Sequence, residues 1–219
     1  MNKKIFTLAV AAVTIMIGSV AYTPGDVAGF EGTIEFKQQS ASDTTNRVYY
    51  VKGDKVRIDE IGSKSKKPEG SFIVDLKAST MTFLSHDRKL YGDQATGGTP
   101  NKPTGTCTVT KGKGTKTIAG YKCTEYIVKN KDENTQIAFY LASGKFDFFS
   151  KLLTVLNRKD KFATYYQQLT NVNGMFPMLA VMSPMDGKEK ERMEVTKVEK
   201  KTVDASQFDV PKDYLKFEK

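Results

Sequence analysis

The chain has 219 residues, with 34 Lys and Arg against 25 Asp and Glu, which gives a formal net charge of +9. This length is sufficient for one domain with a sizeable core. The surplus of positive charge is compatible with an anionic partner such as a lipid headgroup. Basic and acidic residues alternate, as in KEKER at 188–192, which is typical of solvated faces, and no nucleic-acid recognition motif occurs, so a nucleic-acid partner is not expected.

The N-terminus has the pattern of a secretory signal peptide. Lys3 and Lys4 precede an apolar run at 5–18, and small residues follow at 19–21. The run is shorter than the roughly 20 apolar residues that span a bilayer. We therefore expect cleavage after Ala21, leaving one domain at 22–219 in the periplasm or outside the cell, with 198 residues and a charge of +7.

Alternation of polar and apolar residues dominates the rest of the chain. The segments 48–51 and 56–59 flank a glycine-containing turn and predict a β-hairpin, and 72–74 with 81–84 predict a second one. The other predicted strands are 32–37, 88–91, 106–110, 116–119, 122–129, 135–141 and about 191–203, with Gly112 to Gly114 as a hairpin turn. This pattern predicts a mainly β (α+β) fold with one antiparallel sheet that is strongly curved or closed.

The segment 92–105 interrupts the strands with four glycines and two prolines. It predicts a mobile surface loop within the domain rather than a domain boundary. Cys107 and Cys123 are the two cysteines. An even count in an exported chain predicts one disulfide between them, although two buried thiols remain the alternative.

Residues 145–157 place Phe146, Phe149, Leu153 and Leu156 on one helical face, and Asp160 is a suitable N-cap for a second helix. The two helices either pack on the sheet as ordinary core or cover a cavity under its concave face. The methionine-rich segment 175–185 contains two prolines, which predict an edge strand or a flap.

Catalytic and metal-binding patterns are absent from the sequence. His86 is the only histidine, which excludes a multi-histidine metal site, and its neighbours Ser85 and Asp87 point to the opposite face of a strand. No cofactor motif and no catalytic residue is identified. Four aspartates lie at the ends of predicted strands: Asp54, Asp59, Asp75 and Asp87. Two of them could be paired in the folded protein, so a hydrolase that uses two carboxylates remains an alternative.

Seven segments in order resemble a family of exported bacterial proteins, the family of domain of unknown function 4412: FEGTIEF at 30–36, YYVKGDKVRID at 49–59, FIVDL at 72–76, MTFL at 81–84, KLY at 89–91, IAGYKCTEY at 118–126 and FDVPKDY at 208–214. That family in turn resembles the periplasmic lipoprotein carrier and receptor superfamily, LolA and LolB. The resemblance implies a curved antiparallel half-barrel with short helices over an apolar cavity that holds acyl chains. It implies no catalytic residue, and nothing identifies the partner proteins on which such carriers depend.

The leading hypothesis is a non-enzymatic periplasmic protein that holds a lipid or another long apolar ligand in the concavity. Eleven side chains are predicted to line it: Phe36, Tyr50, Ile58, Val74, Phe83, Phe139, Phe149, Leu153, Met178, Met182 and Met193. The alternatives are a structural or interaction module of the envelope with a self-filled core, and a hydrolase. Transient contact with a membrane surface or an envelope protein is compatible with the first two, and the sequence leaves the oligomeric state open.

Overall fold

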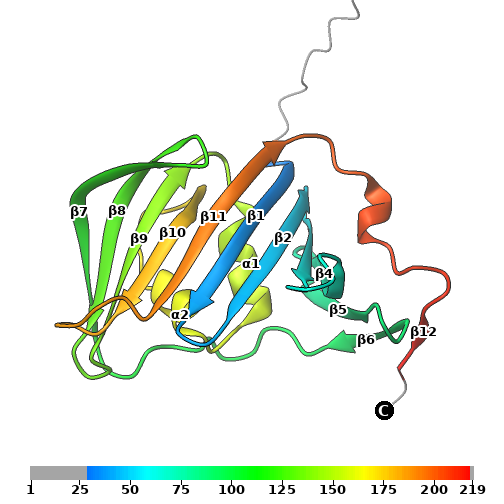
Figure 1. Cartoon of the computed structure of the whole chain (residues 1–219), viewed down its shortest axis with the longest axis horizontal. Helices are drawn as coiled ribbons and strands as arrows, with labels where there is room; N and C mark the ends of the chain where they lie inside the picture. The colour runs from blue at the N-terminus through cyan, green and yellow to red at the C-terminus, as the bar shows by residue number, and fades with distance from the viewer. Residues whose placement is uncertain (1–28, 218–219) are drawn as a thin grey trace, which may run out of the picture.

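Twelve strands form one open, largely antiparallel sheet (Figure 1). The structure is a computed structural model that describes residues 29–217, so the predicted signal peptide at 1–21 lies outside the described residues. The strands run in the order β12-β6-β5-β4-β3-β2-β1-β11-β10-β9-β8-β7, and only β12 is parallel to its neighbour. Their bounds are β1 Gly32–Ser40, β2 Thr44–Lys52, β3 Lys55–Ile61, β4 Pro68–Asp75, β5 Thr80–Ser85, β6 Leu90–Gln94, β7 Cys107–Ile118, β8 Tyr121–Asn130, β9 Thr135–Ser143, β10 Met175–Ser183, β11 Glu191–Lys200 and β12 Leu215–Lys216.

The sheet consists of two meanders that meet in its middle. The strands β1 to β6 extend from β1 toward one edge, and β7 to β11 return from the other edge, so that β11 pairs with β1. The chain between β6 and β7 therefore crosses the molecule, and it runs along the lower rim in Figure 1. The loop predicted at 92–105 overlaps this crossing, but its first three residues, 92–94, belong to β6. Both predicted hairpins are confirmed, as β2–β3 and β4–β5.

Two short helices pack on one face of the sheet, behind it in Figure 1. They are α1, Phe148–Leu156, and α2, Lys161–Tyr166. Asp160 caps α2 as predicted, because its side chain accepts a hydrogen bond from the backbone amide of Ala163 at 3.0 Å. Five of the nine α1 side chains are buried, which fits the apolar face predicted for this segment.

The C-terminal segment crosses the opposite, convex side and ends at β6. It contains the 3₁₀ helix η1, Ala205–Phe208, and the short strand β12. The backbone amides of Leu215 and Phe217 donate to the carbonyls of Lys89 and Tyr91, at 2.9 and 2.7 Å. In this segment the Gln207 carbonyl accepts from Arg57 of β3 at 3.2 Å, and the Tyr214 hydroxyl lies 2.7 Å from His86 Nδ1.

The strand β7 differs from the expectation of two strands separated by a turn at Gly112 to Gly114. It is one strand of 12 residues with a register shift between Lys111 and Thr115 against β8. A Cβ at Gly112 would lie 2.2 Å from an Oε atom of Glu125, so a larger residue there would displace the Glu125 side chain. The two glycines therefore make a β-bulge, and the predicted turn is wrong.

The methionine-rich segment is also placed differently. The prediction of an edge strand or flap is wrong, because β10 lies between β9 and β11. Pairing of β10 with β11 begins only at Leu179, and the register against β9 shifts between Pro177 and Leu179. A proline has no amide hydrogen to donate, and this local interruption of the ladder is what allows an interior strand to contain Pro177.

The predicted disulfide is absent, because Cys107 and Cys123 are both free thiols. Cys107 pairs with Asn130 at one end of the β7–β8 ladder, whereas Cys123 pairs with Lys116 near the other end. Seven residues separate Cys123 from Asn130 along β8, a span of about 23 Å at the usual rise of a strand. A disulfide needs Cα atoms within about 7 Å, so this register keeps the two thiols apart.

Candidate ligand-binding cavity

A cavity of about 150 Å³ lies between the concave face of the sheet and the two helices. Its apolar walls come from five neighbouring strands and from both helices. The sheet contributes Phe36, Tyr49, Phe139, Phe176, Pro177 and Met193, and the helical layer contributes Phe149, Leu153, Leu156, Phe162, Ala163 and Tyr166. A polar set completes the lining: Gln38, Arg47, Arg158 and Asp160.

Aromatic contacts fix the closed part of the cavity. The ring of Phe149 lies 4.6 Å from that of Phe176 and 4.9 Å from that of Tyr166, both in edge-to-face geometry. The Tyr166 hydroxyl donates to the backbone carbonyl of Met175 at 3.1 Å, and burial raises the pKa of this hydroxyl. The polar atom of Tyr166 is thus satisfied, and its ring is left as an apolar wall.

The walls become polar along β1 and β2. Inward positions run from Phe36 to Gln38 on β1 and from Tyr49 to Arg47 on β2, because residues two apart in a strand share a face. Arg47 donates to Gln38 Oε1 at 2.8 Å and pairs with Glu60 at 3.2 Å. The cavity therefore has an aromatic interior and one end that contains hydrogen-bonding groups.

Arg158 reaches this polar end from the link between α1 and α2. Its guanidinium carbon lies 5.8 Å from the centre of the Phe72 ring, and it pairs with no carboxylate among residues 29–217. Burial raises the pKa of the Tyr49 hydroxyl, and the positive charges of Arg158 and Arg47 oppose this shift. The two guanidinium groups therefore act on the same hydroxyl.

The amount of free space is small compared with the whole concavity. The helices and sheet fill most of it with their own side chains, and Phe146, Leu152, Tyr165 and Met178 are all at most 1% exposed. An apolar cavity of about 150 Å³ holds a group of about the size of benzene. In this conformation the cavity therefore accommodates about six carbons rather than a long acyl chain.

Five of the eleven predicted lining residues meet in this cavity: Phe36, Phe139, Phe149, Leu153 and Met193. Three others, Ile58, Val74 and Met178, belong to the solid core and are at most 1% exposed. Met182 borders a polar hollow beside Glu191 and Arg192, and Phe83 lines a separate hollow of about 400 Å³ near Leu90 and Phe217.

Tyr50 lies on the other face of the sheet, and its neighbour Tyr49 takes the cavity position. Residues 48–51 are four consecutive apolar residues, so the sequence does not show which of them face the cavity. A shift of one residue along a strand moves every side chain to the opposite face of the sheet. The sequence also did not point to Arg47, Arg158 or Tyr166. The link that positions Arg158 becomes a neighbour of β2 only through the packing of the helices.

A second buried polar cluster lies on the convex side, under the C-terminal segment. The Ser71 hydroxyl lies 2.6 Å from both Asp59 Oδ1 and His86 Nε2, and His86 Nδ1 lies 2.7 Å from the Tyr214 hydroxyl. Asp59 accepts from Arg57 Nε at 2.6 Å. Ser71 donates to Asp59 and accepts from an Nη atom of Arg57 at 3.3 Å.

The cluster joins β3, β4 and the C-terminal segment. Ser71 donates its hydroxyl hydrogen to Asp59 and has no exposed surface. The segment Ser85 to Asp87 contributes the His86 ring to this cluster.

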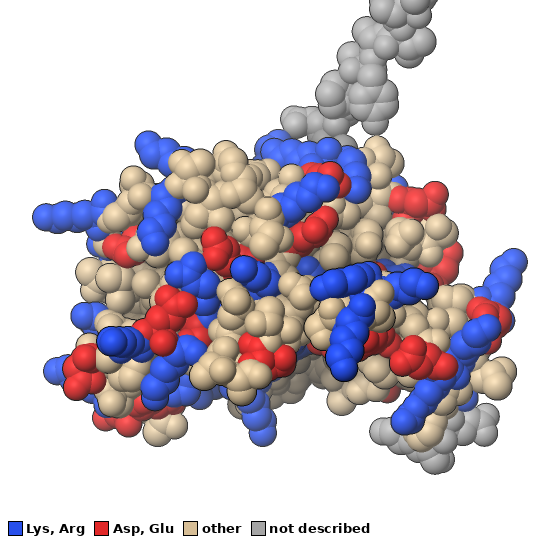
Figure 2. Space-filling model, viewed as in Figure 1, with Lys and Arg blue, Asp and Glu red and all other residues tan. Residues whose placement is uncertain are grey.

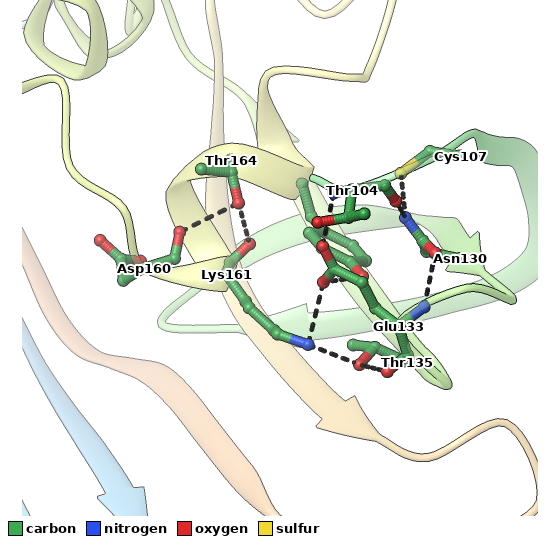
Figure 3. Close-up of polar contacts among 9 residues, drawn as sticks. Thr104, Cys107, Asn130, Glu133, Thr135, Asp160, Lys161 and Thr164 are labelled. Atoms are coloured by element: carbon green, nitrogen blue, oxygen red, sulfur yellow. Dashed lines mark hydrogen bonds and ion pairs between the residues drawn. The ribbon is translucent and has the colours of Figure 1, made fainter. Parts of the chain in front are cut away.

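A third polar cluster ties α2 to the β8–β9 turn and to the end of the β6–β7 crossing (Figure 3). Glu133 accepts from the Thr104 amide at 2.6 Å, from the Tyr165 hydroxyl at 2.9 Å and from Lys161 at 2.9 Å. Asn130 donates to the Thr104 carbonyl at 2.8 Å. These groups satisfy one another, and the cluster fixes the helical layer over the cavity.

The convex face shows Lys and Arg side chains mixed with Asp and Glu, without a field of one sign (Figure 2). Many of these charges are paired, for example Glu199 with both Lys197 and Lys201 at 2.6 and 2.7 Å. Within residues 29–217 no three His, Cys, Asp or Glu side chains are placed to hold a metal ion. No helix of the same residues has the length and apolarity to cross a membrane.

An open antiparallel sheet with two helices on its concave face and a small aromatic cavity between them defines a mainly β protein of the predicted class. The sequence matches the family described as Domain of unknown function (DUF4412) over residues 30–214, and the chain belongs to this family. The predicted family is therefore confirmed. A comparison with curated proteins finds no match.

Solved structures with a similar fold are distant in sequence. An uncharacterized conserved protein from Thermus thermophilus has a TM-score of 0.50 at 8% identity, covering 85% of this chain and 90% of that one. A chain of the Pseudomonas aeruginosa MucA/MucB complex has a TM-score of 0.47 at 11% identity, covering 85% of this chain and 56% of that one. A putative outer membrane lipoprotein-sorting protein domain from Vibrio parahaemolyticus has a TM-score of 0.30 at 10% identity, covering 81% and 87%.

Proposed function

We propose that the chain is a non-enzymatic protein of the periplasm or cell exterior that binds an apolar group, such as the end of an acyl chain, between the sheet and its two helices. The observation that carries the proposal is the cavity of about 150 Å³, with its aromatic and aliphatic walls, inside a core that is otherwise filled. A cavity with such walls binds small apolar groups because their burial removes apolar surface from water.

The cavity volume changes the ligand that we propose. The sequence hypothesis named a long apolar ligand, whereas the free space fits about six carbons. A longer chain requires α1 and α2 to move, which would separate the Phe149 ring from those of Phe176 and Tyr166. We therefore propose a short chain, or the terminal part of a longer one, as the occupant.

The polar side chains favour binding over hydrolysis. Asp54 and Asp75 face lysines, with Asp54 3.4 Å from Lys151 and Asp75 2.6 Å from Lys55. Backbone amides and Lys55 hold the pKa of the Asp75 carboxyl below its ordinary value, whereas a general acid needs a raised pKa. The second candidate is a structural or interaction module that contacts an envelope protein or membrane surface. It is favoured by the extent to which the core is filled by its own side chains.

A series of n-alcohols from butanol to decanol tests the proposal by calorimetry. Affinity should rise about fourfold per methylene, from roughly 0.8 kcal/mol each, and level off near six carbons, where the cavity is full. Ala163→Leu fills the cavity and should abolish binding, whereas Ala78→Leu in an exposed turn is the matched control and should bind like the wild type. If no alcohol binds, the interaction module replaces the binding protein.

A further inference from the structure

Two groups at the polar end of the cavity, the Tyr49 hydroxyl and the Arg158 guanidinium, reach solvent and have no hydrogen-bond acceptor among residues 29–217. The Tyr49 hydroxyl donates to no side chain or carbonyl among residues 29–217, and Arg158 has no carboxylate partner there. Tyr49 is held by the Phe36 ring at 4.8 Å, in edge-to-face geometry, and Arg158 by the face of Phe72. Ring contacts orient both groups without using their donors.

The other charged groups at this end are already engaged. Arg47 has Glu60 and Gln38, and the Asp160 carboxylate accepts from the amide of Ala163 at the start of α2. Among the charges that act on the Tyr49 hydroxyl, Arg158 has the strongest effect. Arg158 is therefore the cation available to a ligand at this end of the cavity.

We propose that the cavity selects single-chain amphiphiles with an anionic headgroup, a carboxylate or a phosphate, which accepts hydrogen bonds from Arg158 and Tyr49 while about six carbons of the chain fill the aromatic interior. The inference rests on the proposed function and adds the headgroup class. An anionic oxygen accepts stronger hydrogen bonds than a neutral hydroxyl, and a guanidinium presents several donors to it at once.

Calorimetry at pH 7.5 with ligands of equal chain length isolates the headgroup. Hexanoate and hexyl phosphate should bind about tenfold or more tightly than hexanol, and hexylammonium more weakly than hexanol. The ratio of hexanoate to hexyl phosphate distinguishes a free fatty acid from a phosphate-bearing lipid as the source of the headgroup.

Variants assign the selectivity to the two donors. Arg158→Gln should lower hexanoate affinity about tenfold and leave hexanol affinity unchanged, and Tyr49→Phe should lower hexanoate affinity by a smaller factor. Lys159→Gln removes an adjacent exposed charge that does not line the cavity, and it should change neither. Equal melting temperatures of the three variants and the wild type exclude loss of fold as the cause.

The outcomes separate this inference from the proposed function. If hexanol and hexanoate bind equally and Arg158→Gln changes neither, the anionic selectivity is wrong and the apolar site stands. If none of the four ligands binds, both are wrong.

Discussion

The methionines of β10 differ in their surroundings, and their substitutions should differ accordingly. Met178 has no exposed surface, whereas Met182 is partly exposed beside charged residues of β11. Met178→Ala should therefore lower the free energy of unfolding by about 2–5 kcal/mol and Met182→Ala by less than about 1 kcal/mol. Urea unfolding measures both, and equal losses would contradict the placement of Met178 in the solid core.

The two thiols should also differ in reactivity. Cys123 is fully buried, and burial raises the pKa of its thiol, whereas Cys107 is partly exposed. Because the thiolate is the reacting species, iodoacetamide should label Cys107 well before Cys123 in the folded protein. Mass spectrometry without reductant measures this, and a protein that takes up no label after unfolding would show that the cysteines are paired after all.

At the scale of elements, the Asn157 side chain makes most of the hydrogen bonds between the end of α1 and the crossing from β6 to β7. Asn157 donates to the carbonyls of Gly97 and Thr99, at 2.6 and 3.1 Å, and accepts from the amide of Asn101 at 3.1 Å. The Asn157 side chain also accepts from Asn101 Nδ2 at 3.0 Å. Asn157 has φ 40°, a conformation that glycine adopts without strain, so Asn157→Gly removes these four bonds. Limited proteolysis should then cut within 95–106 several times faster, whereas Thr154→Gly on the exposed face of α1 should leave this rate unchanged.

The C-terminal segment should respond to pH through His86. Burial lowers the pKa of the His86 ring, Arg57 lowers it further, and Asp59 and Asp87 oppose the shift. The unfolded chain then binds the proton more readily than the folded one, so stability is complete above the unfolded pKa of about 6.5 and falls as the pH drops through it. Wild type should lose more stability than His86→Gln between pH 8 and pH 5.5, by thermal unfolding. Parallel profiles would contradict this role of His86.

Local patterns predicted the elements better than their positions in the sheet. Turn residues between apolar runs predicted both hairpins, and helical spacing with Asp160 as N-cap predicted α1 and α2. The position of β10 could not be predicted, because its accommodation of Pro177 depends on where pairing with β11 begins. The prediction of Tyr50 instead of Tyr49 as a lining residue was wrong for the same reason. Where apolar residues are consecutive, packing decides which of them face the core.

At the scale of the whole molecule, the fold brings distant segments together around one small space. Five central strands and the helical layer surround the cavity, and the cluster at Glu133 holds that layer in place. A competing apolar hollow near Phe83, Leu90 and Phe217 lies at the sheet edge and is formed by other elements. The location of a bound ligand therefore distinguishes the proposed site from the hollow near Phe83.

The most direct measurement is an isotope-filtered NOE experiment on labelled protein with n-hexanol. We expect contacts from the terminal methyl group of the alcohol to Phe139, Phe149 and Leu153, and their loss in Ala163→Leu. Contacts to Phe83, Leu90 and Phe217 instead, unchanged by Ala163→Leu, would place the ligand at the sheet edge and contradict the proposed site.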